Sequence, residues 1–263
     1  MKSRSSFRLE ALLVLLWLTC HGQPRSIAAP PAFDSSHAAW TSILREMVND
    51  EGVDYARLRK QPETLEAYLS QLGAVTRGQF DSWSREEQLA FLLNLYNAAT
   101  LKLVADHYPV RSIRKIGGWL SGPWDQKIVP LFGTRTTLDN LEHHLIRRDY
   151  QEPRIHFALV CAAKSCPPLR REAYNASELD SQLQDQAKQF LADTRKNRFD
   201  AEDRVLYLSP IFEWYARDFE AQAGSVLDFV RPLLPPAQQE FLTGDSIRIR
   251  YTDYDWSLNE QVR

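Results

Sequence analysis

The stretch SREEQLAFLLNLYNAATLKLVADH, residues 84–107, decides the fold of this chain. Ser84 and Glu87 have the spacing of a capping box, in which each side chain bonds the backbone N–H of the other residue, so a helix begins here. Between residues 89 and 103 nearly every position is apolar, whichever face of the helix it occupies. A helix that is apolar all round is buried. The stretch therefore predicts a central helix around which the other elements pack.

Shorter helical and strand-like segments flank this helix. Apolar residues at helical spacing predict helices over 37–48, 62–73, 138–148, 179–191, 212–219 and 237–242. Short apolar or alternating runs predict strands over 128–132, 155–161, 205–208 and 247–251. No repeat or low-complexity tract separates them. Helices outnumber strands, so we expect an α+β fold, a single, mainly helical domain with a small sheet of short strands.

The composition is that of a folded protein of ordinary charge. Of the 263 residues, 44% are hydrophobic and 25% are charged, which is close to the average of soluble globular proteins. Lys and Arg number 32 against 34 Asp and Glu, so no basic excess exists to bind nucleic acid. We expect an N-terminal helical extension over 29–83, packed on a core domain over 84–263.

The N-terminus has the pattern of an export signal. Basic residues within the first eight positions precede a ten-residue apolar run over 11–20, about half the ~20 residues that a membrane-spanning helix needs. Small residues then favour cleavage between Ala28 and Ala29. Cys20 permits a second interpretation, a lipid-anchored cysteine, and an uncleaved anchor is a third. We expect a cleaved signal peptide over 1–28 and a secreted or periplasmic mature chain without a stable membrane span.

Standard nucleotide, metal and hydrolase motifs are absent from the sequence. The missing patterns are G-x-x-x-x-G-K-[ST], G-x-G-x-x-G, H-E-x-x-H, C-x-x-C and G-x-S-x-G. Their absence argues against an NTPase, a dehydrogenase, a zincin, a thioredoxin-like thiol exchanger and an α/β-hydrolase. Metal binding by Glu142, His143, His156 and a cysteine lacks a recognisable ligand spacing. We expect no cofactor.

The stretch HFALVCAAKSCPP, residues 156–168, holds a candidate nucleophile. Pro167 can open a helical turn that leaves Cys166 at its N-cap. A helix N-terminus and the nearby Lys164 would both favour the thiolate, so Cys166 is a candidate nucleophile. In an oxidising compartment a Cys161–Cys166 disulfide is the alternative, and two inert thiols are a third.

Glu142, His143 and His156 are candidate partners of that thiol. Glu142 lies at the edge of the apolar stripe of the 138–148 helix, where a carboxylate needs a partner. It can orient a histidine, as the third member of a Cys–His–acid set does, or form a buried salt bridge. His143 points away from the stripe, towards solvent. Alternation places His156 on the opposite face of the predicted strand from Cys161.

Two further groups are candidate substrate-binding residues. Asn94 and Asn97 lie three residues apart on one face of the central helix, and a buried amide either pins a neighbouring segment or orients a substrate. Trp119 and Trp124 belong to a glycine-rich, basic loop over 111–124. They can stack on a ligand or pack beneath the loop.

Six short segments occur in one order along the chain: NLYNA at 94–98, NLEH at 140–143, RIHFAL at 154–159, SCPP at 165–168, WYARDF at 214–219 and YDWSLN at 254–259. Together they resemble the domain of unknown function 547 family, here a secreted bacterial-type member, over roughly residues 85–259. In other members the domain is fused to glutaredoxin-like or other interaction modules. The resemblance implies no activity, but it places polar family positions at Asn94, Asn97, Glu142, His143, His156 and Cys166, which is typical of a site.

These residues lead to two principal hypotheses of function. The first is a secreted or periplasmic Cys–His type hydrolase or acyl transferase acting on an amide or thioester. Its nucleophile, base and orienting acid would be Cys166, a histidine (His156 or His143) and Glu142, with Asn94 or Asn97 positioning the substrate. The alternative is a non-enzymatic envelope binding module, stabilised by a Cys161–Cys166 disulfide, with its ligand groove near Trp119 and Trp124; a metal-dependent hydrolase is a third. We expect a small-molecule or peptide ligand and no nucleic acid, and the sequence specifies no oligomeric state.

Overall fold

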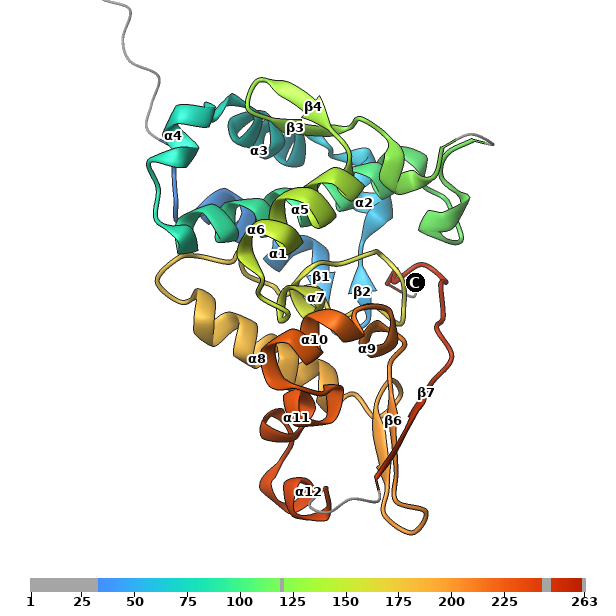
Figure 1. Cartoon of the computed structure of the whole chain (residues 1–263). Helices are drawn as coiled ribbons and strands as arrows, with labels where there is room; N and C mark the ends of the chain where they lie inside the picture. Colours follow the sequence, from blue (N-terminus) through green and yellow to red (C-terminus); the bar gives the residue numbers. More distant parts are fainter. Residues whose placement is uncertain (1–32, 119–120, 243–246, 262–263) are drawn as a thin grey trace, which may run out of the picture. The chain divides into compact units, whose positions relative to one another are not determined.

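The structure is a computed structural model that describes residues 33–118, 121–242 and 247–261 (Figure 1). These residues belong to one compact unit, Phe33–Arg263. The predicted signal peptide, Cys20 and Trp119 lie outside the described residues. Within the described ranges, helices predominate and the short strands form three small sheets. The expected mainly helical α+β fold is therefore confirmed.

The predicted central helix is α5, Arg85–His107. Ser84 Oγ accepts the Glu87 N–H at 3.2 Å, and the Glu87 carboxylate accepts the Ser84 N–H at 2.8 Å, so the capping box is present. From Leu89 to Ala105 every residue except Lys102 is buried. Burial on all faces is what the apolar sequence predicts.

Residues 33–83 pack four helices and a hairpin against α5. The helices are α1 (Ala38–Met47), α2 (Tyr55–Lys60), α3 (Glu63–Ala74) and α4 (Arg77–Asp81), and the hairpin joins β1 (Val48–Asn49) to β2 (Gly52–Val53). α2 and α3 contact α5 directly. Buried side chains of these helices and of α5 form one apolar cluster, in which Trp40 stacks on Tyr68 with ring centres 5.5 Å apart. The boundary predicted at residue 84 stays a prediction.

The chain after α5 returns along it (Figure 1). Two 3-10 turns, η1 (Ile113–Lys115) and η2 (Pro123–Asp125), precede the antiparallel hairpin β3 (Val129–Leu131) and β4 (Thr134–Thr136). A π-helix, η3 (Asn140–Arg147), and the turn α6 (Arg148–Tyr150) follow. The predicted strand over 128–132 and helix over 138–148 are thus present, the helix with π spacing. π-helical turns are rare and are frequently found at functional sites.

Residues 155–161 do not form the predicted strand. They begin with one helical turn, α7 (Ile155–Ala158), and continue in an extended conformation. The extended part is hydrogen-bonded to α5: Asn97 Nδ2 donates to the Ala158 carbonyl at 3.0 Å, and Asn97 Oδ1 accepts the Val160 N–H at 2.9 Å. A side-chain amide thus takes the place of a neighbouring strand, and such a tertiary contact overrides strand propensity.

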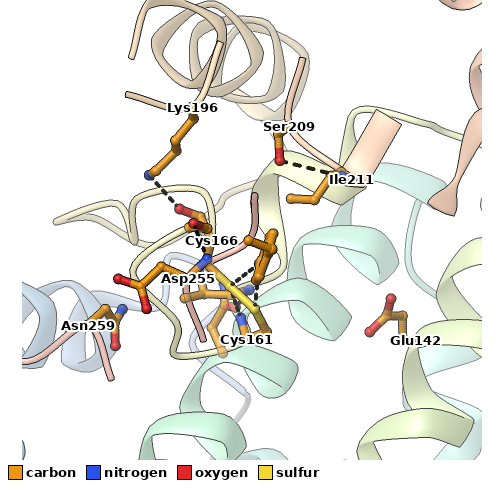
Figure 2. Close-up of a disulfide and its surroundings, with 12 residues drawn as sticks. Glu142, Cys161, Cys166, Lys196, Ser209, Ile211, Asp255 and Asn259 are labelled. Carbon is orange, nitrogen blue, oxygen red and sulfur yellow. Dashed lines mark hydrogen bonds between the residues drawn. A yellow bond between two sulfur atoms is a disulfide. The ribbon is translucent and has the colours of Figure 1, made fainter. Parts of the chain in front are cut away.

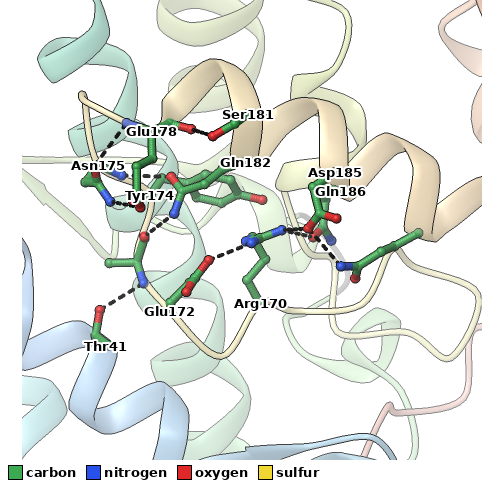
Figure 3. Close-up of polar contacts among 12 residues, drawn as sticks. Thr41, Arg170, Glu172, Tyr174, Asn175, Glu178, Ser181, Gln182, Asp185 and Gln186 are labelled. Carbon is green, nitrogen blue, oxygen red and sulfur yellow. Dashed lines mark hydrogen bonds and ion pairs between the residues drawn. The ribbon is translucent and has the colours of Figure 1, made fainter. Parts of the chain in front are cut away.

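The segment 167–178 has neither helix nor strand and is held by polar contacts (Figure 3). Asn94 makes a second bidentate bond here, donating from Nδ2 to the Tyr174 carbonyl at 2.7 Å and accepting the Tyr174 N–H at 3.0 Å. Arg170 is ion-paired with Glu172 at 2.6 Å and with Asp185 at 2.5 Å. These contacts fix the segment between α5 and the helix that follows it.

The helical turn expected at Pro167, with Cys166 as its N-cap, is absent from this segment. The prediction is wrong because Pro168 follows directly, and a proline disfavours the helical conformation of the residue before it. The backbone dipole of a helix therefore does not act on Cys166.

Residues 179–251 form a second layer of helices and the three-stranded sheet. The elements are α8 (Leu179–Ala192), β5 (Arg198–Asp200), β6 (Val205–Leu208), α9 (Ile211–Trp214), α10 (Ala216–Ala223), α11 (Val226–Val230), η4 (Arg231–Leu233), α12 (Pro236–Phe241) and β7 (Arg248–Tyr251). β6 pairs antiparallel with β5 and parallel with β7. Five phenylalanines, Phe157, Phe190, Phe212, Phe219 and Phe229, dominate a second apolar cluster. The helices and strands predicted in this range are present.

The C-terminal segment, residues 252–261, ties the two halves of the unit together. Its Asn259 N–H donates to the Ala162 carbonyl at 3.1 Å, and its carbonyl accepts the Val53 N–H at 2.9 Å. Gly52 makes this approach feasible, since it has φ +145° and a Cβ atom there would lie 2.2 Å from the Asn259 oxygen. Only glycine combines that backbone conformation with so close a contact.

Candidate functional site

A cavity of about 430 Å3 lies between α5, η3, α9 and the C-terminal segment. Its volume is within the range of small-molecule sites, roughly 300–1,000 Å3. Six aromatic side chains of the described residues line it: Tyr96, Trp124, Trp214, Tyr215, Tyr254 and Trp256. Six of the sequence-predicted site residues also line it, namely Glu142, His143, His156, Cys161, Cys166 and Trp124. The tertiary structure thus brings these candidates to one cavity.

Glu142 places a buried carboxylate in the cavity wall. The Tyr96 hydroxyl donates to Glu142 Oε2 and the Tyr215 hydroxyl donates to Oε1, each at 2.8 Å. Burial, and then the carboxylate itself, raise the pKa of both tyrosines well above the ordinary value. Both hydroxyls therefore stay protonated as donors, and Glu142 is an oriented acceptor. No ion pair to Glu142 occurs among the described residues.

His156 is held between an aromatic ring and a carboxylate. Its ring stacks on Tyr215 with centres 3.7 Å apart, and Nε2 lies 2.8 Å from Asp218 Oδ2. Burial lowers the pKa of His156, although Asp218 acts in the opposite direction. The imidazole is therefore neutral near pH 7, and because the carboxylate can only accept, Nε2 carries the proton and Nδ1 does not. The carboxylate that holds His156 is Asp218 and not Glu142; a role of Glu142 towards His143 stays a prediction.

Asp218 is also paired with Arg147 of η3. Arg147 Nε donates to Oδ2 at 2.5 Å and Nη2 donates to Oδ1 at 2.9 Å. Although burial works against it, hydrogen bonds from His156 and Arg147 lower the pKa of Asp218. Asp218 is thus ionised and neutralises the guanidinium, which leaves the Glu142 carboxylate without a cation in direct contact in the described part of the chain.

His143 faces the cavity rather than bulk solvent, contrary to the prediction. Its side chain is 35% exposed, and Nε2 lies 3.8 Å from Asp139 Oδ1. Nδ1 is buried and has no hydrogen-bond partner among the described residues. The π spacing of η3 explains the difference, because it rotates side chains relative to the α-helical wheel from which the prediction was made. His144, the next residue, is exposed.

Cys161 and Cys166 form a disulfide in the wall of the cavity, with Cα atoms 6.1 Å apart (Figure 2). The disulfide considered from the sequence is thus present. In this state Cys166 has no thiol and is not a nucleophile. The proposed catalytic role of Cys166 therefore applies only to a reduced form and stays a prediction.

The candidate substrate-binding residues do not all line the cavity. Trp124 lies in the cavity wall, whereas Asn94 and Asn97 are not among its lining residues. Both amides are engaged in the bidentate backbone bonds described above. Asn97 holds the extended chain that leads to Cys161, so it positions the cavity wall without lining the cavity itself.

Comparison with known proteins gives one match. Residues 80–191 match the model of the family described as "Protein of unknown function, DUF547". Over these residues the chain is similar to that family. No curated protein and no solved structure matches it significantly. The resemblance inferred from the sequence over roughly 85–259 is confirmed up to residue 191, and the match brings no activity with it.

The DUF547 match covers only part of the cavity. It includes α5, η3, α7 and both cysteines, and so contributes Tyr96, Trp124, Glu142, His143 and His156. The remaining walls come from residues after the match, chiefly Trp214, Tyr215, Tyr254 and Trp256. The cavity is therefore completed by the chain that follows the DUF547 match.

Sequence reasoning missed several residues in or beside the cavity. Asp218, Arg147 and Tyr215 were not candidates, although WYARDF contains two of them as part of the family resemblance. The sequence signal that could have indicated them is two aromatic residues close to an acidic residue within one short segment. Tyr254 and Trp256 had the same signal in YDWSLN.

Two absences hold for the described part of the chain. Among its residues, no three His, Cys, Asp or Glu side chains are arranged to hold a metal ion. None of the described helices has the length and apolar character that crossing a membrane requires.

Proposed function

We propose that the cavity binds a small organic cation, which is a specific form of the binding-module hypothesis. The observation that carries the proposal is the oriented, buried Glu142 carboxylate beside a cluster of aromatic rings. Aromatic ring faces attract cations, and cages of such rings are used to recognise quaternary ammonium groups. A carboxylate in a low-dielectric wall adds a charge that the ligand can neutralise.

Four rings line the space for such a ligand, and one of them, Trp256, already has the Arg114 guanidinium 5.1 Å from its centre. Trp124, Trp214, Tyr254 and Trp256 form a connected cluster, with ring centres 4.6–6.0 Å apart between neighbours. Tyr215 is already covered by His156 and by the Arg147 guanidinium at 5.1 Å. Trp214 is 47% exposed, so the cluster reaches the surface.

The charge of the lining supports a cationic ligand. Asp125, Asp139 and Glu142 are among the lining residues, and within the described ranges no lysine or arginine is. His156 is held neutral by burial, which lowers its pKa. An anionic ligand would meet repulsion here without a compensating base.

Titration with choline tests the proposal, followed by the fluorescence of the wall tryptophans. The matched control ligand is 3,3-dimethyl-1-butanol, which has the shape of choline without its charge. We expect choline to bind about tenfold more tightly than the neutral analogue. Equal affinities, or no binding of either, would refute the proposal.

Substitutions of cavity residues test whether choline binds in this cavity. Glu142→Gln should weaken choline binding about tenfold, because it removes the charge and keeps the shape. Glu202→Gln, an exposed residue outside the cavity, is the matched control and should leave it unchanged. Trp214→Leu should weaken binding about fivefold at an exposed site where folding is not at stake.

The Cys–His hydrolase or acyl transferase is a second candidate, and one observation favours it. Asp218 orients the His156 imidazole in the wall of the same cavity that Cys166 lines, and an imidazole held by a carboxylate is the kind of base that activates a thiol nucleophile. Reduced protein should then release thiol from a small thioester, and oxidised protein should not. The activity should disappear in Cys166→Ser and in His156→Asn, and activity that survives in both would exclude this candidate.

We further propose that the chain is exported by a cleaved signal peptide over 1–28. The Cys161–Cys166 disulfide supports this, because disulfides persist mainly in oxidising compartments. The intact mass of the protein recovered from the cell should correspond to a chain that begins at Ala29. A lipid-modified chain beginning at Cys20 would establish the anchored alternative instead.

A further inference from the structure

The two sulfurs of the Cys161–Cys166 disulfide differ in their surroundings. Both residues line the cavity, but Cys161 is partly exposed whereas Cys166 is only 2% exposed. A thiol that enters the cavity can therefore reach Cys161 Sγ more readily. Access and the choice of sulfur attacked are two determinants of thiol–disulfide exchange.

Cys166 Sγ is surrounded by hydrogen-bond donors. The Cys161 N–H donates to it at 2.9 Å, and the Tyr254 hydroxyl lies 3.4 Å from Cys166 Sγ and 3.1 Å from Cys161 Sγ, within reach of both sulfurs. Burial raises the pKa of Tyr254 above its ordinary value, so this hydroxyl stays a donor. Such donors bind a thiolate more strongly than a disulfide sulfur, because hydrogen bonds to ionised acceptors are stronger.

A positive charge lies close to the same residue (Figure 2). Lys196 Nζ donates to the Cys166 carbonyl at 2.7 Å and is ion-paired with Asp193 at 3.3 Å. A nearby ammonium also favours a thiolate. The Cys161 N–H, which bonds Cys166 Sγ, and the ammonium at the Cys166 carbonyl favour Cys166 as the leaving sulfur, while Tyr254 serves either sulfur.

The loop that carries both cysteines is held independently of the disulfide. Lys164 N–H donates to the Ser257 carbonyl at 2.8 Å, and Ser165 N–H donates to the Asp255 carbonyl at 3.2 Å. Ser165 Oγ accepts the Asp255 N–H at 2.8 Å. These contacts to the C-terminal segment persist when the S–S bond opens, so the sulfurs stay close enough to rejoin.

We propose that Cys161–Cys166 is a redox-active disulfide that exchanges with a small dithiol entering through the cavity. A thiolate of the dithiol attacks Cys161 Sγ, the S–S bond breaks, and its electron pair passes to Cys166 Sγ. The second thiol of the dithiol then attacks the mixed disulfide and releases Cys161. The dithiol leaves as a disulfide, the protein gains two electrons, and the two thiol protons of the dithiol balance the two new cysteine thiols. The disulfide and the proposed cation site share one cavity, but the exchange requires no bound cation.

The first test uses the folded full chain and dithiothreitol as the probe dithiol. We expect one disulfide per chain before treatment and complete reduction without denaturant, with unchanged far-ultraviolet circular dichroism and full reoxidation in air. Reduction that requires denaturant, or that unfolds the chain, would overturn the proposal. So would two free thiols in protein purified without reductant.

The second test measures thiolate formation in the reduced protein by ultraviolet absorbance as the pH is raised. Cys161→Ser, which retains Cys166, should form its thiolate at a lower pH than Cys166→Ser, which retains Cys161. Adding Tyr254→Phe to Cys161→Ser should raise its midpoint by about one pH unit, the value of one hydrogen bond to a charged group. Tyr251→Phe, an exposed tyrosine outside the cavity, is the matched control. Equal midpoints for the two single-cysteine variants would contradict the leaving-group assignment.

Discussion

The imidazole of His156 lies parallel to the ring of Tyr215, with ring centres 3.7 Å apart and planes 17° apart. This stacking joins two hydrogen-bonded groups, since Tyr215 donates to Glu142 and His156 donates to Asp218. The two carboxylates of the site are thereby placed by one aromatic contact between α7 and the start of α10. A change at either ring is transmitted to both acids.

Asp218→Asn should destabilise the protein by about 2 kcal/mol. The substitution removes the charge that neutralises Arg147 and one of the two oxygens that accept from Arg147 and His156, in a partly buried site. Urea unfolding measures the difference in free energy. Asp81→Asn is the matched control, because Asp81 pairs with Arg77 on the exposed face of α4 and should contribute no more than about 0.5 kcal/mol. Equal losses for the two variants would contradict this account.

Asn97→Ala should lower the free energy of unfolding by about 3 kcal/mol. It leaves the buried Ala158 carbonyl and Val160 N–H without partners, and each unsatisfied group costs about 1–3 kcal/mol. Asn140→Ala provides the comparison, since that side chain makes one bond, to Thr136, in a partly exposed site. Its loss should stay below about 1 kcal/mol. A loss under 1 kcal/mol for Asn97→Ala would show that the bidentate bond is not what fixes this segment.

Stability should fall between pH 6.5 and pH 4 because of His37. Burial lowers its pKa to about 4, with Asp34 acting in the opposite direction, whereas the unfolded chain titrates near ~6.5. The unfolded state therefore binds the proton first as the pH falls. The stabilising contribution is complete above pH 6.5, and up to about 3 kcal/mol of it is lost by pH 4.

Urea unfolding of His37→Gln at pH 7 and at pH 4.5 checks this dependence. The variant should lose less stability between the two pH values than the wild type does. His144→Gln is the control, because His144 is exposed, and it should behave as the wild type. A wild-type pH dependence in His37→Gln would contradict the prediction.

Gly52→Ala should destabilise the protein by about 2 kcal/mol or more. At φ +145° the new Cβ would lie 2.2 Å from the Asn259 carbonyl oxygen, so the C-terminal segment must move. Gly78→Ala in α4 is the matched control, because no atom lies within 4 Å of the position that its new methyl group would take. That variant should gain about 0.5–1 kcal/mol from helix propensity. If the contact is as described, thermal unfolding shows a lower melting temperature for Gly52→Ala and a higher one for Gly78→Ala.

The central helix and the family were predictable because their signals are local. Ser84 and Glu87 are three residues apart, and the apolar run over 89–103 fits the buried helix whatever its neighbours are. The strand predicted over 155–161 was wrong for the converse reason. Its backbone groups bond Asn97, some sixty residues earlier in the chain, and no local pattern indicates that partner.

The sequence by itself determined the mainly helical α+β class, the capped central helix, the DUF547 resemblance and the residue types available for a site. Only the tertiary structure decided which of them meet. It placed Glu142, His156 and the disulfide in one cavity. It also determined that His156 is hydrogen-bonded to Asp218, and that Trp214, Tyr254 and Trp256 form the aromatic wall. The physical reason is that helix caps and periodicity act over a few residues, whereas a cavity is made by packing between segments that are distant in sequence.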